Sequence, residues 1–546
     1  METALTESLA AELEPEQASH GILKNKIYLY ITEFFSGMSV MAVELGASRL
    51  LAPYFSSSQI VWTIIIGTIM IAMALGNIYG GASADKNPDP DKLYSRLLTA
   101  AVWIAAIPIF GKLVILGISA LLVFTVSTNF LIWAAFLACM IIFVYPLFLL
   151  GTVTPSLVKY TVSSLDNSGS TVGRLGAFNT VGSIIGTFVP TFISIPTVGT
   201  AATFLIFSGI LLVLALIYFA SVKRKKIKSA VCIVLFALCC IFGTTTGFAF
   251  WETSLVYEGE SIYNYLQVKE TDQKTILSTN VLFGVQSVAM KGGGLSGLYY
   301  DYAMAAPMMT DGGGDGCDIL ILGMGTGTYA KQCTEYFDNI YVEGVEIDEK
   351  ITELAREYFD LPESVKVTTY DGRAFLNVSE QTYDVIMVDA YQDITIPFQM
   401  STVEFFSSVK AHLKENGVMV VNMNMKSDRE GSVNDRLIAT IASVFSEVYT
   451  IDVSSTTNRE LFASQNSSMI QNLQSSIADC EDEQLAALMS DISARLTASE
   501  GSGDVLTDDC APVELLGMQV IDDLISDELK DYKEILKEEG IKGLIE

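Results

Sequence analysis

The stretch ILILGMGTGTYAKQ, residues 319–332, decides the fold of the second half of this chain. Its first four residues are apolar and predict a buried strand, whereas the residues after the glycines predict a helix. Between them, Gly323, Gly325 and Gly327 form a G-x-G-x-G turn. Because glycine has no side chain, a ligand can approach the backbone closely at this turn, where a helix begins. The stretch therefore predicts a turn that binds a nucleotide or a nucleoside.

The pattern of a strand followed by a helix repeats along the chain after Cys317. The apolar strand candidates are residues 318–323, 340–348, 365–371, 383–391 and 417–424. Alternation of strands and helices predicts a doubly wound, mainly parallel sheet, as in the Rossmann-like α/β fold. In such a sheet the ligand lies at the carboxyl ends of the strands.

Acidic residues stand at these predicted strand ends. Glu346 ends the second strand and can accept hydrogen bonds from ribose hydroxyls, and Asp348 follows it as a further candidate. Asp371 and Gly372 end the third strand, where we expect contacts to adenine. Asp389 ends the fourth strand and is expected to face the reactive part of the ligand. The alternative is that these glycines and acids only form turns and helix caps.

A single nucleoside of the S-adenosyl type fits this turn better than a dinucleotide does. Thr328 occupies the place of the last glycine in the dinucleotide motif G-x-G-x-x-G. We therefore expect Thr326 and the three glycines to contact an S-adenosyl ligand.

Metal and histidine chemistry have little support in the sequence. The chain has only His20 and His412 and no C-x-x-C pair, so we expect neither a zinc site nor a histidine-based triad. Four of its eight cysteines lie in the second half, where two disulfides are possible and free thiols are the default that we favour. These four are Cys317, Cys333, Cys480 and Cys510.

The composition divides the chain into two halves. Its 546 residues are too many for one core, and a mean hydropathy of +0.41 is unusual for a soluble protein. Long apolar runs continue to about Phe250, and ordinary globular sequence rich in Asp and Glu follows. The formal charge of −29 argues against binding of nucleic acid, which needs a basic surface. It suits a cationic small molecule, although it also suits a domain that acidity merely keeps soluble.

The apolar half is predicted to be a multi-pass α-helical membrane domain in the plasma membrane. A helix needs roughly 20 apolar residues to cross a bilayer, and the chain offers about seven such segments. The candidate spans are residues 28–52, 59–82, 96–125, 130–158, 176–198, 200–220 and 229–250. Residues 1–26 form a polar tail without the features of a secretory signal peptide.

Charged residues inside the first span are candidates for a role within the bundle. Glu33, Glu44 and Arg49 are costly in lipid unless they face the bundle interior or a water-filled cleft. They either form a structural Glu–Arg pair or handle a cation, and the sequence leaves both possibilities open.

Basic residues predict the orientation in the bilayer. Every second loop is basic, including the run KRKKIK at residues 223–228. By the positive-inside rule these loops are cytoplasmic, which with seven spans favours the outer side for the second half. Splitting the long third segment into two spans would place that half inside, but would also put the basic loop of Lys159 and Arg174 outside, so the side stays open. Adenosyl donors are made in the cytosol, so this expectation conflicts with an S-adenosyl ligand.

Several motifs together resemble one family, the membrane-fused branch of the spermidine synthases (polyamine aminopropyltransferases). In the second half they are GMGTGT at 323–328, VEGVEID at 342–348, TTYDGRAF at 368–375, DVIMVDAYQDITIPFQMSTVEFF at 384–406 and LTDDCAPVELL at 506–516. In the apolar half, FLLGTVTPSL at 148–157 and GRLGAFNTVGSIIG at 173–186 look like the corresponding signatures of transporter-like fused members. The resemblance covers about residues 27–516.

The resemblance implies a domain organisation. It places a transmembrane domain at 27–250, a small β subdomain at 251–310, a Rossmann-like domain at 311–465 and a helical extension at 466–546.

The resemblance also implies a reaction and its residues. An amine attacks the carbon beside the sulfonium of decarboxylated S-adenosylmethionine, which acts as a co-substrate, and no cofactor is bound permanently. Asp389 then orients and deprotonates the amine, and Tyr391 and Asp393 shape the loop above it. A polyamine or another small amine is the expected substrate, a homodimer is possible, and the substrate side is expected to include three residues. These are Gln286, Asp301 and Tyr302.

Three departures from the family pattern leave other functions open. Thr326 replaces a donor-binding Asp in the glycine turn, Asn264 replaces a donor-binding Gln, and a second loop acid is displaced to Asp393 or missing. A methyltransferase that uses intact S-adenosylmethionine is therefore one alternative. A polyamine or cation transporter with a nucleoside-sensing domain is the other.

Overall fold

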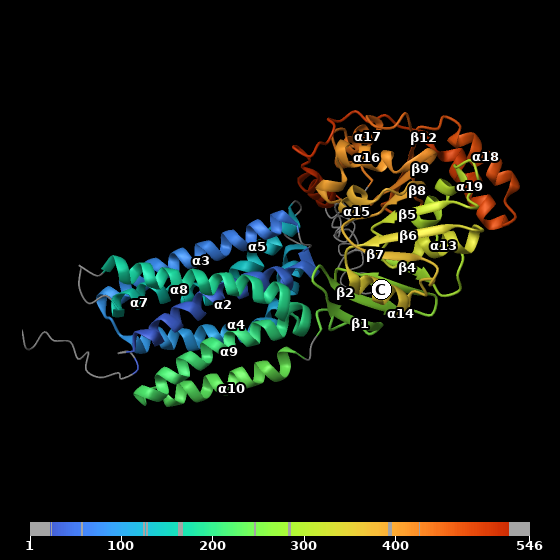
Figure 1. Cartoon of the computed structure of the whole chain (residues 1–546). Coiled ribbons are helices and arrows are strands. Elements are labelled where there is room, and N and C mark those ends of the chain that lie inside the picture. The colour runs from blue at the N-terminus through green and yellow to red at the C-terminus, as the bar shows by residue number, and fades with distance from the viewer. Residues whose placement is uncertain are drawn as a thin grey trace, which may run out of the picture. The chain divides into compact units, whose positions relative to one another are not determined.

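The computed structural model describes residues 22, 25–55, 58–123, 126, 129–161, 168–244, 247–281, 285–390, 396–424 and 426–523. The chain forms two compact units (Figure 1). The first falls within Met1–Leu51, Ile60–Leu121 and Ile132–Phe248. The second falls within Ala52–Gln59, Leu122–Leu131 and Ala249–Glu546.

The first unit is a helical bundle. Its helices are α2 (Lys26–Phe55), α3 (Gln59–Lys86), α4 (Pro90–Val123), α5 (Phe130–Ile142), α6 (Val144–Gly151), α7 (Val153–Thr161), α8 (Ser168–Val189), α9 (Ile195–Val222) and α10 (Lys226–Gly243). A π-helical turn, η2 (Pro190–Ser194), joins α8 to α9. The helices lie side by side along most of their length (Figure 1).

Within the described residues, 5 helices are long and apolar enough to cross a membrane, or up to 6 if one bent pair is a single span. The sequence predicts about seven spans, and part of the difference arises at one glycine. The continuous helical segment Ser168–Val222 contains the two spans predicted at 176–198 and 200–220. Gly199 breaks its helical geometry between them, with φ 81° and ψ 169°.

Glycines bring the helices of this bundle into backbone contact, because small residues let two helices approach closely. A Cβ at Gly182 or Gly186 of α8 would overlap the carbonyl oxygens of Phe34 or Met38 on α2. A Cβ at Gly76 of α3 would likewise overlap the carbonyl oxygen of Phe148 on α6. The seams between these helices therefore admit no larger side chain.

The second unit begins with a small antiparallel sheet in the order β1-β2-β3-β4. Its strands are β1 (Leu255–Glu260), β2 (Tyr265–Glu270), β3 (Lys274–Ser278) and β4 (Ser287–Met290). Two short helices follow, α11 (Tyr299–Ala303) and α12 (Ala305–Met308). The predicted β subdomain, 251–310, is therefore too long, because both helices bury apolar side chains in the core beneath the larger sheet.

The larger sheet has eight strands in the order β12-β10-β11-β9-β8-β5-β6-β7. The five strands β5 to β9 run parallel, and β10, β11 and β12 are antiparallel to their neighbours. They are β5 (Asp318–Leu322), β6 (Tyr341–Glu346), β7 (Lys366–Thr369), β8 (Tyr383–Val388), β9 (Leu413–Met423), β10 (Glu447–Asp452), β11 (Arg459–Ser464) and β12 (Thr497–Ala498). The predicted doubly wound sheet is confirmed, and its strand order reverses at β5, where a ligand crevice is expected.

Helices cover both faces of this sheet (Figure 1). One core holds side chains of α11, α12, α13 (Thr328–Tyr336), α18 (Met469–Asp479) and α19 (Glu483–Arg495). The other holds side chains of α15 (Gly372–Val378), α16 (Val403–Ala411) and α17 (Val433–Ala442). Helix α14 (Glu349–Tyr358) packs instead against the small sheet. The predicted extension after 466 is thus part of the domain, since α18 and α19 complete a core and β12 pairs with β10.

Candidate active site

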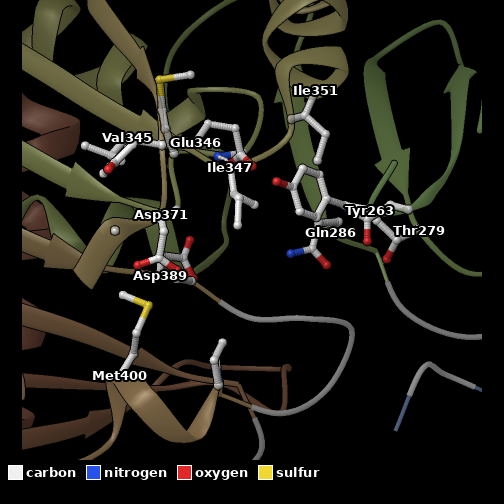
Figure 2. Close-up of a pocket in the computed structure, with 18 of the residues that line it drawn as sticks. Tyr263, Thr279, Gln286, Val345, Glu346, Ile347, Ile351, Asp371, Asp389 and Met400 are labelled. Carbon is white, nitrogen blue, oxygen red and sulfur yellow. Dashed lines mark hydrogen bonds between the residues drawn. The ribbon is translucent and has the colours of Figure 1, made fainter. Parts of the chain in front are cut away.

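A pocket opens at the carboxyl ends of β5, β6, β7 and β8, at the predicted crevice (Figure 2). It holds about 980 Å³ of space, including open solvent at its mouth. The large sheet contributes Gly323, Gly325, Glu346, Asp371, Gly372 and Asp389. The small sheet and its loops contribute Tyr263, Asn264, Thr279, Gln286 and Ser287. All of these residues belong to the second unit.

The glycine turn lies tightly against the end of β8. Gly323 has φ 83°, and a Cβ there would come within 2.7 Å of the carbonyl oxygen of Asp389 and the nitrogen of Ala390. Only glycine satisfies both the left-handed backbone and this close approach. The turn and the catalytic candidate Asp389 are therefore held together through main-chain atoms.

Glu346 ties the glycine turn to the end of β6. Its buried carboxylate accepts hydrogen bonds from the backbone nitrogen of Gly325 at 2.9 Å and from that of Asp348 at 3.0 Å. Burial raises the pKa of Glu346 to about 7, because desolvation outweighs these backbone hydrogen bonds. Each carboxylate oxygen can accept a second hydrogen bond, so both can still receive a ribose hydroxyl.

Asp371 has one carboxylate oxygen engaged in the protein. Its Oδ1 accepts a hydrogen bond from the backbone nitrogen of Ala374 at 2.8 Å and so caps the start of α15. Asp371 and Gly372 both line the pocket, as predicted. Figure 2 shows Asp371, Glu346 and Asp389 around the same cavity.

Asp389 is held by one donor on each oxygen. The hydroxyl of Tyr299 donates to Oδ2 at 2.6 Å, and Nδ2 of Asn422 donates to Oδ1 at 2.8 Å. Asn422 is oriented in turn by Nδ2 of Asn458, which donates to its Oδ1 at 2.8 Å. Burial raises the pKa of Asp389 to about 7, although both hydrogen bonds act in the opposite direction. The arrangement is that of a fixed base whose pKa is close to neutral pH.

A second buried carboxyl lies on β11, opposite Asn422 in the ladder. The side chain of Glu460 is fully buried, and neither of its oxygens has a hydrogen-bond partner among the described residues. Burial, and then the charge of Asp389, raise its pKa well above the usual value. Glu460 is therefore less readily ionised than an exposed glutamate, and Asp389 is the acid of this pair that lines the pocket.

Two predicted substrate residues do not line the pocket. Asp301 accepts hydrogen bonds from Nε2 of Gln332 at 2.6 Å and from the nitrogen of Gly297 at 2.6 Å, so it braces the loop before α11. The hydroxyl of Tyr302 donates to Oγ of Ser454 at 3.2 Å. Tyr299, whose hydroxyl contacts Asp389, is the residue of this segment that the sequence reasoning missed, because the run LYYDY does not reveal the phase of so short a helix.

Three predicted donor-binding residues also lie outside the pocket lining. The nitrogen of Thr326 is 3.4 Å from Oγ of Ser287, and its buried side chain lies beside Thr328. Gly327 caps the start of α13. Asp348 caps α14, and its Oδ2 accepts hydrogen bonds from Oγ of Ser261 at 2.5 Å and from Nδ2 of Asn264 at 3.0 Å. Asp348 thus fastens the loop after β1 to the Rossmann-like domain.

The remaining predictions have mixed outcomes. Gln286 lies in the pocket, and its role stays a prediction (Figure 2). Tyr391 and Asp393 lie outside the described residues. All eight cysteines are described and free, so the possible disulfides are absent from the part of the chain that the structure describes. Within those same residues, no group of three or more His, Cys, Asp or Glu side chains could hold a metal ion.

Comparison with known proteins gives consistent matches. The family model "Spermine/spermidine synthase domain" matches residues 298–460. A probable polyamine aminopropyl transferase of Bifidobacterium longum is 54% identical over 347 residues, covering 60% of this chain and 77% of that protein. A polyamine aminopropyltransferase of Vibrio vulnificus is 28% identical over 230 residues, covering 40% of this chain and 74% of that protein.

Among solved structures, a probable spermidine synthase from Corynebacterium glutamicum is 21% identical, with a TM-score of 0.36 and coverage of 46% of this chain and 96% of that chain. The long and highly identical match to the Bifidobacterium protein decides the assignment. The chain belongs to the family of polyamine aminopropyltransferases, the spermidine synthases, and is an aminopropyltransferase.

Proposed function

We propose that the second unit transfers an aminopropyl group from decarboxylated S-adenosylmethionine to an amine nitrogen of a polyamine. The observation that carries the proposal is Asp389, a half-buried residue whose carboxylate is fixed by Tyr299 and Asn422 at the end of β8. It lies in the pocket that also holds the glycine turn and Glu346.

Each side chain has a defined part in this reaction. Glu346 accepts hydrogen bonds from the ribose, and the glycine turn lets the adenosyl group approach the backbone. The amine nitrogen forms a bond to the carbon beside the sulfonium, the carbon–sulfur bond breaks, and methylthioadenosine leaves with the electron pair. Asp389 takes the proton that the amine must lose. Positioning of the two reactants supplies much of the remaining rate enhancement.

The charges around the pocket favour the decarboxylated donor over the intact one. The described lining includes the carboxylates of Glu346, Asp371 and Asp389 and no Lys, Arg or His. The carboxylate of intact S-adenosylmethionine would meet no counter-charge there, whereas the decarboxylated donor presents only its sulfonium and its ammonium group, which these carboxylates attract. This difference weighs against the methyltransferase alternative.

A product assay separates these two activities. The purified protein is incubated with either decarboxylated or intact S-adenosylmethionine and with putrescine or spermidine, and the sulfur-containing product is identified by mass spectrometry. We expect methylthioadenosine from the decarboxylated donor. Formation of S-adenosylhomocysteine from the intact donor, without methylthioadenosine, would contradict the proposal.

Tyr299→Phe is expected to lower kcat/KM by about 10- to 100-fold, since a hydrogen bond to a charged group contributes about 1.5–3 kcal/mol. Without the 2.6 Å hydrogen bond, the pKa of Asp389 rises further, so the acidic limb of the pH profile moves to higher pH. Tyr302→Phe is the matched control, because that hydroxyl bonds Ser454 outside the pocket. An unchanged pH profile in Tyr299→Phe would show that the hydroxyl does not act on Asp389.

We propose further that the helical unit spans the plasma membrane, with the second unit on the outer face. The length and apolarity of the helices support the first part, and the basic loops support the second. Cys510, an exposed thiol of the second unit, offers a direct test. A membrane-impermeant maleimide should label Cys510 in intact cells and give no adduct at this position in Cys510→Ser. Labelling only after the cells are lysed would place this unit in the cytosol.

A further inference from the structure

The first unit contains one fully buried acid whose charge is not compensated. Glu33 on α2 is 0% exposed, and it forms no ion pair with any described residue. Glu44 and Arg49 are only half-buried, and Glu44 lies about 16 Å further along the same helix, given a rise of 1.5 Å per residue. The three predicted charged residues therefore do not form one cluster, and Glu33 has its own surroundings.

Two other helices direct polar donors at Glu33. Oγ1 of Thr154 on α7 donates to Oε1 at 2.6 Å, and Nδ2 of Asn179 on α8 donates to the same oxygen at 2.9 Å. The other oxygen, Oε2, is buried and has no hydrogen-bond partner among the described residues. One oxygen of the carboxyl group therefore accepts two hydrogen bonds, and the other accepts none from the described residues.

The positions of both partners are fixed by the fold. Thr154 lies just after the break between α6 and α7, in a pair of helical segments bent by 49° at Phe143. Asn179 lies next to Gly37 of α2, where a Cβ would come within 2.5 Å of the Asn179 carbonyl oxygen. Thr154 and Asn179 belong to the motifs FLLGTVTPSL and GRLGAFNTVGSIIG, none of whose residues lines the transferase pocket.

The chemistry of the free oxygen selects the kind of occupant. A buried carboxylate without a counter-charge is strongly disfavoured, so Oε2 needs a proton or a cation. A metal ion needs several oxygen ligands, and here Oε1 already accepts two donors, which leaves Oε2 as the single oxygen of the carboxylate without a partner. An O–H or N–H donor suits this site because it needs only one acceptor.

We propose that Oε2 of Glu33 holds a proton that a primary ammonium group of a polyamine displaces. The exchange is balanced: the carboxylic acid and the ammonium give a carboxylate–ammonium pair and one released proton. The choice of a polyamine rests on the proposed function of the second unit, because that reaction defines the amine class. The structure thereby assigns the helical unit an amine-binding site separate from the transferase pocket.

Carbodiimide labelling tests the proposal on the full chain in lipid nanodiscs. Dicyclohexylcarbodiimide reacts with protonated carboxyl groups in apolar surroundings, and peptide mass spectrometry locates the adduct. We expect an adduct on Glu33 whose rate of formation falls at least about tenfold with saturating putrescine, as occupancy of one site requires. Sodium chloride at the same ionic strength should give no protection. The adduct should persist in Glu44→Gln and vanish in Glu33→Gln.

Two results would overturn the proposal, and both can be read from the wild-type protein alone. The absence of any adduct would mean that the acid is not protonated or not accessible. An adduct whose formation putrescine does not slow would show that Glu33 is a buried protonated acid that binds no amine. Methylthioadenosine formation is measured on the same samples and should be equal in wild type and Glu33→Gln. If wild type forms none, the proposed transferase reaction fails while the result of the labelling experiment stands.

Discussion

Asp389→Asn is expected to lower kcat by about 10²- to 10⁴-fold, the usual contribution of a general base. The amide cannot take a proton from the amine, yet it keeps the size and the hydrogen-bonding positions that face Tyr299 and Asn422. Affinity for methylthioadenosine should stay within about threefold of wild type, because the proposed contacts of the adenosyl group lie on the glycine turn and Glu346. Single-turnover kinetics and equilibrium titration with methylthioadenosine measure the two quantities.

The pKa of Asp389 also fixes the pH dependence of wild type. Since the pKa is raised to about 7, the carboxylate that accepts the proton is the major form only above that pH. We expect kcat/KM to fall about tenfold per pH unit below about pH 7 as the base becomes protonated. In Asp389→Asn this decrease of kcat/KM at low pH should disappear. If it persisted unchanged, a group other than Asp389 would be the one that becomes protonated.

A measurement of Tm tests whether Asp389→Asn loses activity because it unfolds. The folded-state pKa of Asp389 is raised from its ordinary value of 3.8 to about 7, so the loss of stability that it causes builds up between these two pH values and is complete above about pH 7. At pH 8 the Tm of Asp389→Asn should therefore equal or exceed that of wild type. Asp384→Asn, at the other end of β8 and bound to Lys414, is the control and should retain activity.

Glu346→Gln is expected to weaken methylthioadenosine binding by about 10²- to 10³-fold, since two hydrogen bonds to a charged group contribute about 3–4 kcal/mol. In wild type both carboxylate oxygens accept from backbone nitrogens, those of Gly325 and Asp348. The glutamine amide offers one acceptor and one donor, so its NH2 group faces a backbone N–H and the turn loses an anchor. Isothermal titration at pH 8 measures the change.

The control for this variant is Glu349→Gln, an equivalent exchange of an exposed residue at the start of α14. It should bind methylthioadenosine as wild type does. If Glu346→Gln also kept wild-type affinity, Glu346 would not bind the ribose, and the adenosyl group would have to lie elsewhere in the pocket.

The parts of the site that follow from sheet periodicity could be predicted from the sequence. Glu346, Asp371 and Asp389 each end an apolar strand, and parallel strands bring their carboxyl ends to one edge. Their place in one pocket therefore required only the strand assignments and the alternation with helices. The glycine turn could also be predicted, because G-x-G-x-G between a strand and a helix is typical of a nucleotide- or nucleoside-binding turn.

Side chains whose direction depends on local backbone geometry could not be predicted. Thr326 stands between two glycines with positive φ, Gly325 at 57° and Gly327 at 79°, and its side chain lies beside Thr328 rather than in the pocket lining. The sequence predicts Asp348 as a ligand contact because it closely follows Glu346. In the structure its side chain caps α14 instead.

Long-range pairings were also beyond the sequence. The link from Asn422 to Asp389 joins residues of neighbouring strands, and the link from Tyr299 spans 90 positions of the chain. In α2, no periodic signal distinguishes the fully buried Glu33 from the half-buried Glu44.

The contact between Gly323 and the main chain of Asp389 and Ala390 has an evolutionary consequence. The glycine turn and the strand end that carries Asp389 are in contact through main-chain atoms, so a shift of one requires a shift of the other. Substitutions at this contact are expected to abolish turnover. A change of preferred acceptor is therefore expected opposite it, at Tyr263, Thr279 and Gln286, which line the pocket from the loops of the small sheet. Divergence among relatives with different amines should concentrate in that layer, while the strand ends stay invariant.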